Sequence, residues 1–298
     1  MASAPYRYRS HDEDSARWFG FRHRPGDIVI STRRRTGTTW MQMICALLIF
    51  QRPELPAPLW HLSPWLDHAI QPPDIVNARL AQQPHRRFIK THTPLDGIPL
   101  DPRVTYIVTG RHPLDMFVSL RHQIDNIDRA RMLQATGNAT PAEPREPLRD
   151  SLVRWIGDDG RSGDYPESLP LVMWHLADAW ARRAEPNVVL VHYDDLCADL
   201  EGQMRGIAWR LGIGVPEQVW PALVRAATFE RMRDRADRLV PATQGIFRDT
   251  ASFFRRGSSG AGRELLSDAE IAAYHARVAE LGPPDMLRWL HSPSTVAG

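Results

Sequence analysis

One cationic side chain of this sequence differs from all the others. The 298 residues contain 37 lysines and arginines, and Lys90 is the only lysine among them. A position that stays lysine in such an arginine-rich chain favours a need for a compact ammonium charge, which a planar guanidinium does not supply. His92 follows two residues later, and histidine is the side chain most often used as a general base near neutral pH. We therefore expect the chemistry at Lys90-Thr91-His92, although the lysine count alone leaves open a chance survivor at a strand end.

A second segment has the order of elements typical of a phosphate-binding loop. Residues 26–31 are a short β-branched run that predicts a buried strand, and residues 40–50 are an apolar run that predicts a helix. Between them, Gly37 lets an anion approach the backbone, and the N–H groups and dipole at the helix start favour its charge. An ordinary capped helix is the alternative. The loop adds a cation and two hydroxyl donors through Arg35, Thr38 and Thr39.

The loop differs from that of nucleotide triphosphatases. Their Gly-x-x-x-x-Gly-Lys-Ser/Thr pattern needs two glycines and a lysine, whereas residues 32–39 contain one glycine and no lysine. We therefore expect a ligand with fewer phosphates and no obligatory magnesium ion. The remaining histidines have no metal-ligand spacing, so no metal site is predicted.

Strands and helices that must position these residues alternate along the chain. This alternation predicts an α/β fold, a three-layer parallel sheet with helices on both faces and a P-loop-like phosphate-binding loop. We expect residues 1–298 to form a single domain, in which 134–170, rich in Pro, Gly, Asp and Glu, is a lid or insertion. Further strands are predicted at 87–90, 104–109 and 188–193, and helices at about 114–132, 171–183, 196–211 and 217–227, with a capped final helix starting at Ser267.

Polar residues follow four of the predicted strands. They come directly after Ser31, Lys90, Thr109 and His192. In parallel sheets wrapped by helices, ligands bind outside the carboxyl ends of the strands. The lysine–histidine segment and the phosphate-binding loop are therefore expected to meet at one edge of the sheet.

The composition excludes several broad classes. A formal net charge of +2 gives no overall field for a nucleic-acid partner. The N-terminal segment lacks the apolar core of a signal peptide, and the longest apolar run, 41–50, is too short to span a bilayer. We therefore expect a cytoplasmic protein without an integral membrane segment. The excess of arginine, alanine and proline is typical of GC-rich bacterial coding.

Six segments between residues 31 and 260 together resemble the cytosolic-type sulfotransferases, which use 3′-phosphoadenosine 5′-phosphosulfate (PAPS). Arg-Thr-Gly-Thr-Thr-Trp at 35–40 resembles the Lys-Ser-Gly-Thr-Thr-Trp loop of that family, and 90–92 resembles its catalytic Lys-Thr-His. The bacterial aryl and glycolipid branch, including mycobacterial-type enzymes, has the most similar pattern. The other four segments are Arg111 to Ser119 with Pro113 and Asp115 between them, Tyr193-Asp194-Asp195, Thr228-Phe229…Met232 and Phe254-Arg255-Arg256-Gly257-Ser258-Ser259-Gly260.

The resemblance implies a role for each matching residue. His92 is expected to take the proton of an acceptor hydroxyl, and Lys90 to stabilise charge on the sulfonate. Arg35 and the amides of the loop are expected at the 5′-phosphate and the bridging oxygen. The remaining cofactor-binding positions are Thr36, Gly37, Thr38, Thr39, Trp40, Arg111, Ser119, Tyr193, Thr228, Phe229, Met232, Arg255, Arg256 and Gly257, of which Trp40 and Phe229 are expected around the adenine.

The predicted function is transfer of a sulfonate from PAPS to a hydroxyl of a small aromatic, steroid-like or glycolipid acceptor, leaving 3′-phosphoadenosine 5′-phosphate (PAP). Trp60, Trp65, Leu66 and Met132 are expected in an apolar acceptor wall. The sequence does not identify the acceptor and leaves a homodimer open.

Three departures from the family pattern keep other functions open. They are Arg35 in place of lysine, His112 beside Arg111, and Ala-Gly-Arg at 261–263 where the family continues Asp-Trp-Lys. A non-catalytic binder of PAP-type nucleotides or sulfated lipid is one alternative. A P-loop-type small-molecule kinase, which would need magnesium, is the other.

Overall fold

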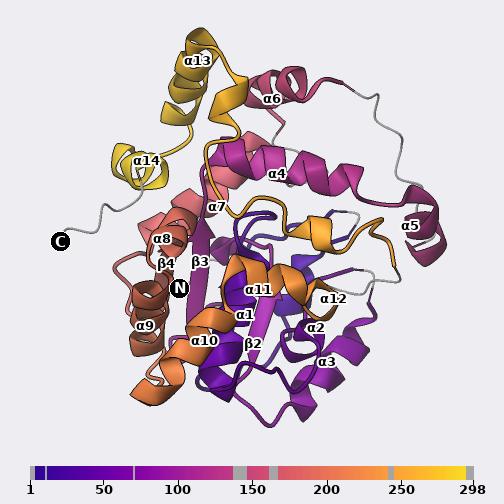
Figure 1. Ribbon diagram of the computed structural model, residues 1–298, viewed down its shortest axis with the longest axis vertical. Helices are drawn as coiled ribbons and strands as arrows, with labels where there is room; N and C mark the ends of the chain where they lie inside the picture. Colours follow the sequence, from indigo (N-terminus) through magenta and orange to yellow (C-terminus); the bar gives the residue numbers. More distant parts are fainter. Residues whose placement is uncertain are drawn as a thin grey trace.

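A parallel sheet forms the centre of the molecule (Figure 1). The computed structural model describes residues 4–10, 12–69, 71–136, 146–160, 167–240 and 245–292. Four strands of this described part pair in the order β2-β1-β3-β4, and every pair is parallel, which confirms the predicted α/β sheet. The strands are β1 (Ile28–Ser31), β2 (Phe88–Thr91), β3 (Thr105–Gly110) and β4 (Val188–His192).

Successive strand residues enter two hydrophobic cores, one on each face of the sheet. Val29 and Ile89 belong to the first core, and Ile28 and Ile30 belong to the second. All four side chains are fully buried, as expected for parallel strands covered on both faces. Helices α4 (Pro113–Asp125), α6 (Leu148–Gly157), α7 (Leu169–Ala181), α13 (Asp268–Ala279) and α14 (Pro284–His291) complete the first core, and α1 (Thr38–Phe50), α9 (Leu200–Arg210) and α10 (Trp220–Ala226) complete the second.

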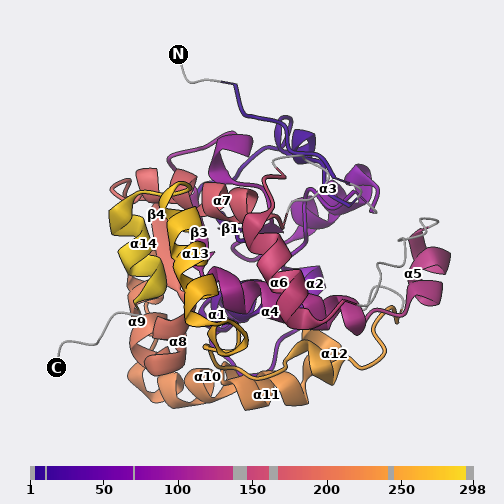
Figure 2. The same ribbon diagram turned by 90° about the horizontal axis from the view of Figure 1, so that it is seen from above.

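Shorter elements surround this three-layer arrangement. Both views place α1 near the centre of the molecule, while α5 (Arg129–Thr136) stands at the periphery (Figures 1 and 2). No helix in the described ranges is both long and apolar enough to cross a membrane. The other short helices are α2 (Leu59–Leu62), α3 (Pro73–Gln82), α8 (Tyr193–Ala198), α11 (Phe229–Asp234) and α12 (Ala236–Leu239), and the 3-10 turns include η1 (Ser15–Trp18) and η4 (Ala251–Phe253).

Two helices expected as single elements are divided. The expected helix 114–132 is interrupted between α4 and α5, because the backbone there pairs with a distant segment. Arg248 N–H donates to the Asn126 carbonyl at 2.8 Å, and Asp128 N–H donates to the Ile246 carbonyl at 2.7 Å. The expected helix 196–211 is divided at Asp199, whose side chain accepts from the Gly202 N–H and starts α9.

The expected lid or insertion at 134–170 is partly a core element. Its described part contains α6, and Leu152 and Trp155 of this helix are buried in the first core. Trp155 Nε1–H also donates to the Glu167 carbonyl at 2.8 Å, which fixes the start of the next helix. Residues 137–145 and 161–166 lie outside the described residues.

The C-terminal helices seal the first core beneath the end of β3. The predicted capped start at Ser267 is confirmed, since Ser267 and Glu270 form a reciprocal capping box. The following helix, α14, was not predicted. Its Trp289 lies so close to Gly110 that a Cβ atom there would be 2.4 Å from the Trp289 ring. The last residue of β3 therefore has no room for a side chain.

Candidate active site

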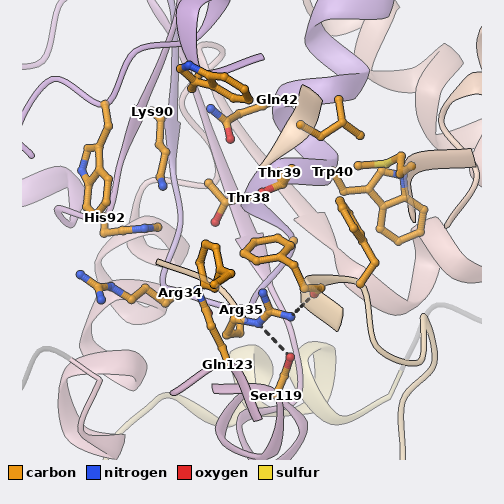
Figure 3. A pocket seen from close by; sticks show the side chains of 18 of the residues that line it. Arg34, Arg35, Thr38, Thr39, Trp40, Gln42, Lys90, His92, Ser119 and Gln123 are labelled. Atoms are coloured by element: carbon orange, nitrogen blue, oxygen red, sulfur yellow. Dashed lines mark hydrogen bonds between the residues drawn. The ribbon is translucent and has the colours of Figure 1, made fainter. Parts of the chain in front are cut away.

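A cavity of about 420 Å³ lies at the carboxyl ends of the four strands (Figure 3). Its walls include Arg34 after β1, Lys90 in β2, Arg111 after β3 and Tyr193 after β4. The sheet thus brings together the polar segments that follow the predicted strands. We call Lys90, His92 and Trp65 the lysine end of this cavity, and Arg35, Arg111, Ser119 and Arg255 its arginine end.

His92 is held in one tautomer. It is 3 % exposed, and its Nδ1 contacts the Thr32 carbonyl. A carbonyl oxygen only accepts hydrogen bonds, so Nδ1 carries the proton and Nε2 keeps a lone pair. Burial, followed by the charges of Lys90 and Arg34, holds the pKa of His92 well below its usual value. The imidazole is therefore neutral at neutral pH, the form that a general base requires.

Lys90 lies beside His92 at the same end. Its Nζ atom is 3.9 Å from the centroid of the Trp65 ring, a cation–π contact, and the same ring meets His92 edge to face at 4.7 Å. Burial, and then the Arg34 charge, lower the pKa of Lys90 to about 8. Figure 3 shows the ammonium and the imidazole converging on the cavity. A protonated lysine and a neutral histidine are therefore adjacent near pH 7.

The two arginines next to the lysine end, Arg33 and Arg34, form ion pairs with carboxylates. Arg33 Nη1–H donates to the His92 carbonyl at 2.6 Å, and Arg33 also pairs with the buried Glu167 at 3.3 Å. Arg34 Nε is 3.0 Å from the same Glu167 carboxylate. Arg34 also pairs with Asp12 and Glu13 of the N-terminal segment. The arginines next to the base are thus neutralised by carboxylates.

The predicted phosphate-binding loop has the expected backbone geometry. Gly37 precedes α1 with φ of 110°, and a Cβ atom there would be 3.2 Å from Tyr193. Thr38 and Thr39 begin α1 and line the cavity, so the amides of the first helical turn open toward it. Thr36 does not line the cavity. Its hydroxyl donates to the Arg33 carbonyl at 2.7 Å and so shapes the loop.

Arg35 points away from the lysine end. Its Nε–H donates to Ser119 Oγ at 2.9 Å, and its Nη2–H donates to the Phe253 carbonyl at 2.8 Å (Figure 3). The guanidinium also stacks on the Phe253 ring at 4.4 Å. Burial, then the charges of Arg111 and Arg255, lower the pKa of Arg35 to about 10. The expectation placed Arg35 at the 5′-phosphate, whereas here it joins the residues expected at the 3′-phosphate.

Arg111 is the centre of the arginine end. It stacks over the Tyr193 ring at 4.2 Å and donates from Nη1 to the Arg35 carbonyl at 2.9 Å. Its Nε is buried and has no hydrogen-bond partner among the residues that the structure describes, as expected of a donor reserved for a ligand. Arg255, Arg256 and Gly257 also line this part of the cavity. Arg256 pairs with Glu264 at 3.6 Å, whereas Arg35, Arg111 and Arg255 have no ion pair with a carboxylate in the described part of the chain. Three such cations suit a phosphate group.

Aromatic residues line the wall beyond the loop. Trp40 Nε1–H donates to the Ala227 carbonyl at 2.8 Å, and its ring meets Tyr193 edge to face at 5.4 Å. Phe229 and Met232 line the same wall, so a flat base has apolar surfaces to contact. Thr228 does not line the cavity, because its side chain caps α11 by accepting from Arg231 N–H.

The expected acceptor wall is largely where the sequence placed it. Trp60, Trp65 and Met132 line the cavity, as do the polar residues His68 and Gln71. The prediction that Leu66 belongs to this wall is wrong, because Leu66 is 1 % exposed and belongs to the first core. It alternates with Trp65 on an extended segment, so the two side chains point to opposite sides.

Among the residues at the site that sequence reasoning missed, Phe253 and Asp67 hold its side chains in place. Phe253, which holds Arg35, lies in a segment whose placement depends on tertiary contacts and gave no local pattern. Asp67, a buried carboxylate behind β2, follows Leu66 in a proline-rich stretch without helical or strand periodicity. A single aspartate in such a stretch resembles a solvated turn residue, so no signal singled it out.

Comparison with protein families identifies the architecture. The model of the sulfotransferase domain matches residues 25–281. Glycolipid sulfotransferases of Mycobacterium bovis and Mycobacterium tuberculosis are each 40% identical to this chain, covering 95% of it and 93% of the relatives. Sulfotransferase 1A1 of Rattus norvegicus is 24% identical over 86% of this chain and 84% of its own length.

Solved structures share the fold. Retinol dehydratase in complex with androsterone and the inactive cofactor PAP superposes with a TM-score of 0.68 at 21% identity, covering 89% of this chain and 83% of that one. Mouse sulfotransferase SULT7A1 complexed with PAP superposes with a TM-score of 0.63 at 18% identity, covering 88% and 86% of the two chains.

Proposed function

We propose a reaction for this chain from the premise that it belongs to the sulfotransferase family and is a sulfotransferase. The family model spans 25–281, and relatives at 40% identity match almost the whole chain. The proposed reaction moves a sulfonate group from PAPS to a hydroxyl of an acceptor and leaves PAP. PAP in two solved structures of the same fold supports this co-substrate. The uncompensated cations of the arginine end fit its phosphates.

The proposed acceptor is a glycolipid. Both mycobacterial relatives are named glycolipid sulfotransferases. The acceptor wall combines Trp60 and Trp65 with the polar side chains of Gln71 and His68. Indole faces pack against the C–H faces of sugar rings while polar groups reach the hydroxyls, and this combination suits a sugar headgroup better than a purely apolar phenol.

The lysine end would carry out the transfer. The acceptor oxygen forms a bond to sulfur while the bond from sulfur to the 5′-phosphate oxygen breaks, and His92 Nε2 takes the acceptor proton. Lys90 lies where charge develops on the sulfonate oxygens. Transfers of this type pass through a loose transition state, so position and electrostatic stabilisation supply most of the catalysis.

The arginine end would hold the nucleotide. Arg111, Ser119, Arg255 and Arg256 are the proposed contacts of the 3′-phosphate, for which forked guanidinium donors are suited. Arg35 would join this group, since its guanidinium is bonded to Ser119. The loop amides at Gly37 to Thr39 would bind the 5′-phosphate, and Trp40 and Phe229 the adenine.

The observation that carries the proposal is the pairing of a neutral His92, with Nδ1 bonded to a carbonyl, and the charged Lys90 in one cavity. The first test is thermal stabilisation by PAP, AMP and ADP, each with and without magnesium. A real ligand at a hundredfold excess over its dissociation constant adds about 2.7 kcal/mol to the unfolding free energy. We expect PAP to stabilise the protein without magnesium. Stabilisation by ADP with magnesium alone would instead favour the kinase.

A second test addresses the acceptor. Purified enzyme is supplied with PAPS labelled with radioactive sulfur, together with a glycolipid, its delipidated sugar or a simple phenol. We expect label to enter the glycolipid and, more slowly, the sugar. Stabilisation by PAP without transfer to any of the three would favour the non-catalytic binder.

A further inference from the structure

A short segment runs beside β2 and forms the back of the lysine end. Lys90 N–H donates to the Pro64 carbonyl at 2.9 Å, and Leu66 N–H donates to the Lys90 carbonyl at 3.3 Å. Trp65 and Lys90 thus form a parallel bridge that extends the sheet by one position. Asp67 is the next residue of this segment, so it lies beside the last residues of β2.

The Asp67 carboxylate is fully buried and binds three donors through one oxygen. Oδ2 accepts from Trp18 Nε1–H at 3.0 Å, from Thr93 Oγ1–H at 2.5 Å and from the Thr91 hydroxyl. Asp67 therefore joins η1 and the end of β2. Three hydrogen bonds to one buried oxygen favour an ionised carboxylate, although burial itself raises the pKa of Asp67.

These contacts determine which way the transfer residues face. Thr91 and Thr93 precede and follow His92, and both turn toward Asp67. Because successive side chains of an extended chain point to opposite sides, Lys90 and His92 must turn the other way, into the cavity. A carboxylate that holds the two threonines therefore orients the lysine and the histidine.

The charge of Asp67 also acts on Lys90. The charged groups around Lys90 are Arg34 on the phosphate-binding loop, Glu13 and Asp12 on the N-terminal segment, and Asp67 behind β2. Burial and Arg34 lower the pKa of Lys90, and the three carboxylates oppose them. Arg34 itself is paired with Asp12 and Glu13, whereas Asp67 makes no ion pair within the described residues. Its charge is therefore the least compensated of the three.

We propose that Asp67 is a positioning residue for sulfonate transfer, which turns Lys90 and His92 into the cavity through Thr91 and Thr93 and keeps Lys90 protonated. This inference depends on the proposed function for the roles of Lys90 and His92. It adds a residue that touches neither the nucleotide nor the acceptor.

The single lysine of the chain makes a direct test available. Lys90 is the only side-chain amine, so its labelling by an amine-reactive reagent, followed by mass spectrometry of its peptide across pH, reports its own titration. Asp67→Asn keeps an oxygen for the three donors and removes the charge. We expect the half-point of labelling to move to lower pH by roughly one unit. Asp178→Asn is the control, because Asp178 is a partly buried acceptor of the Asp96 N–H, pairs with Arg182 and is absent from the charges around Lys90.

Kinetics separate the orienting contact from the charge. Thr93→Val removes one donor and retains the carboxylate, so kcat is expected to fall roughly threefold while the Lys90 titration stays in place. Asp67→Asn is expected to lower kcat about tenfold, and PAP affinity should be unchanged in both variants. If Asp67→Asn does not fold, Thr93→Val still tests the orienting contact.

Two outcomes would overturn the inference. One is an unchanged Lys90 titration in folded Asp67→Asn, and the other is kcat within twofold of the unsubstituted enzyme in both variants. Lys90→Ala and His92→Ala, measured in parallel, test separately the proposed function on which the inference depends. If these two retain turnover, the proposed function fails, whereas loss of turnover in them with an unaffected Asp67→Asn rejects the role of Asp67 alone.

Discussion

The two ends of the cavity differ in whether their arginines are paired with carboxylates. At the lysine end, Arg34 pairs with three carboxylates, and Arg33 shares one of them. At the arginine end, Arg35 and Arg111 have no carboxylate partner within the described ranges and donate to a hydroxyl and to backbone carbonyls. Neutral acceptors fix these guanidiniums without cancelling their charge.

This difference reflects two physical tasks. Transfer needs a base and an acid in fixed positions and protonation states, so the surrounding charges are balanced and buried. Binding of a phosphate needs a net positive potential, so the charges are left uncompensated until the ligand arrives. Substitutions at the two ends should therefore change different kinetic quantities.

The largest expected effect is at His92. His92→Ala removes the proposed base and should lower kcat by about 10²–10⁴-fold. PAP affinity should stay within about twofold, because the arginine end is untouched. His275→Ala, an exposed histidine on α13, is the control. Retained turnover in His92→Ala would contradict the division between the two ends.

Arg111 should show the opposite profile. Arg111→Ala removes a proposed charged donor to the 3′-phosphate and should raise the PAP dissociation constant by about 10–100-fold. AMP, which has no 3′-phosphate, is the control ligand, and its affinity should change by about threefold or less. Titration calorimetry with both nucleotides measures the ratio. Equal losses for PAP and AMP would show that Arg111 supports the loop rather than the phosphate.

Reciprocal exchange of lysine and arginine sharpens the comparison. Lys90→Arg conserves charge but places a wide fork where a compact ammonium lies on Trp65, so kcat should fall at least tenfold, about 1.4 kcal/mol of barrier. Arg35→Lys should chiefly weaken PAP binding, because Arg35 contacts Ser119 and not the lysine end. Steady-state kinetics with varied PAPS separate the two. A larger loss of kcat in Arg35→Lys would reverse the assignment.

The smallest predicted effect is the pH dependence. The proposed reaction uses neutral His92 and protonated Lys90, so the rate should rise as pH passes the His92 pKa and fall as pH passes the Lys90 pKa. The first limb should lie well below pH 6.5, and the second near pH 8. In Lys90→Arg the alkaline fall should disappear and the plateau should extend to higher pH, because the guanidinium does not titrate there.

The sheet was predictable because its signal is local. Ile28, Val29 and Ile30 are a continuous apolar run between turn residues, and a buried parallel strand needs such a run. The divided helices were not predictable, because Asn126 and Asp128 take their partners from 246–248, more than a hundred residues away. Helix α6 was hidden because the composition of 134–170 averages its apolar side with the polar segments around it.

The candidate site, like the fold, has a part that the sequence predicted and a part that it did not. Residues that belong to a motif, such as Lys90, His92 and Arg111, line the cavity as expected. The contacts that orient them were not visible, since Asp67 and Phe253 reach them only through the tertiary fold. Thr36 and Thr228 each belong to a motif, yet their side chains form hydrogen bonds to the backbone and do not line the cavity. A motif therefore identifies the segment at a site and not the task of each side chain in it.

The contact between Gly110 and Trp289 has an evolutionary consequence. A β-carbon at position 110 would overlap an indole that also packs against Trp180 and His192. Position 110 can therefore change only after position 289 has become smaller, and the order of these substitutions is fixed. Because Arg111 follows directly, related chains that lose the tryptophan should vary together at the C-terminal helix and at the residue before the arginine that corresponds to Arg111.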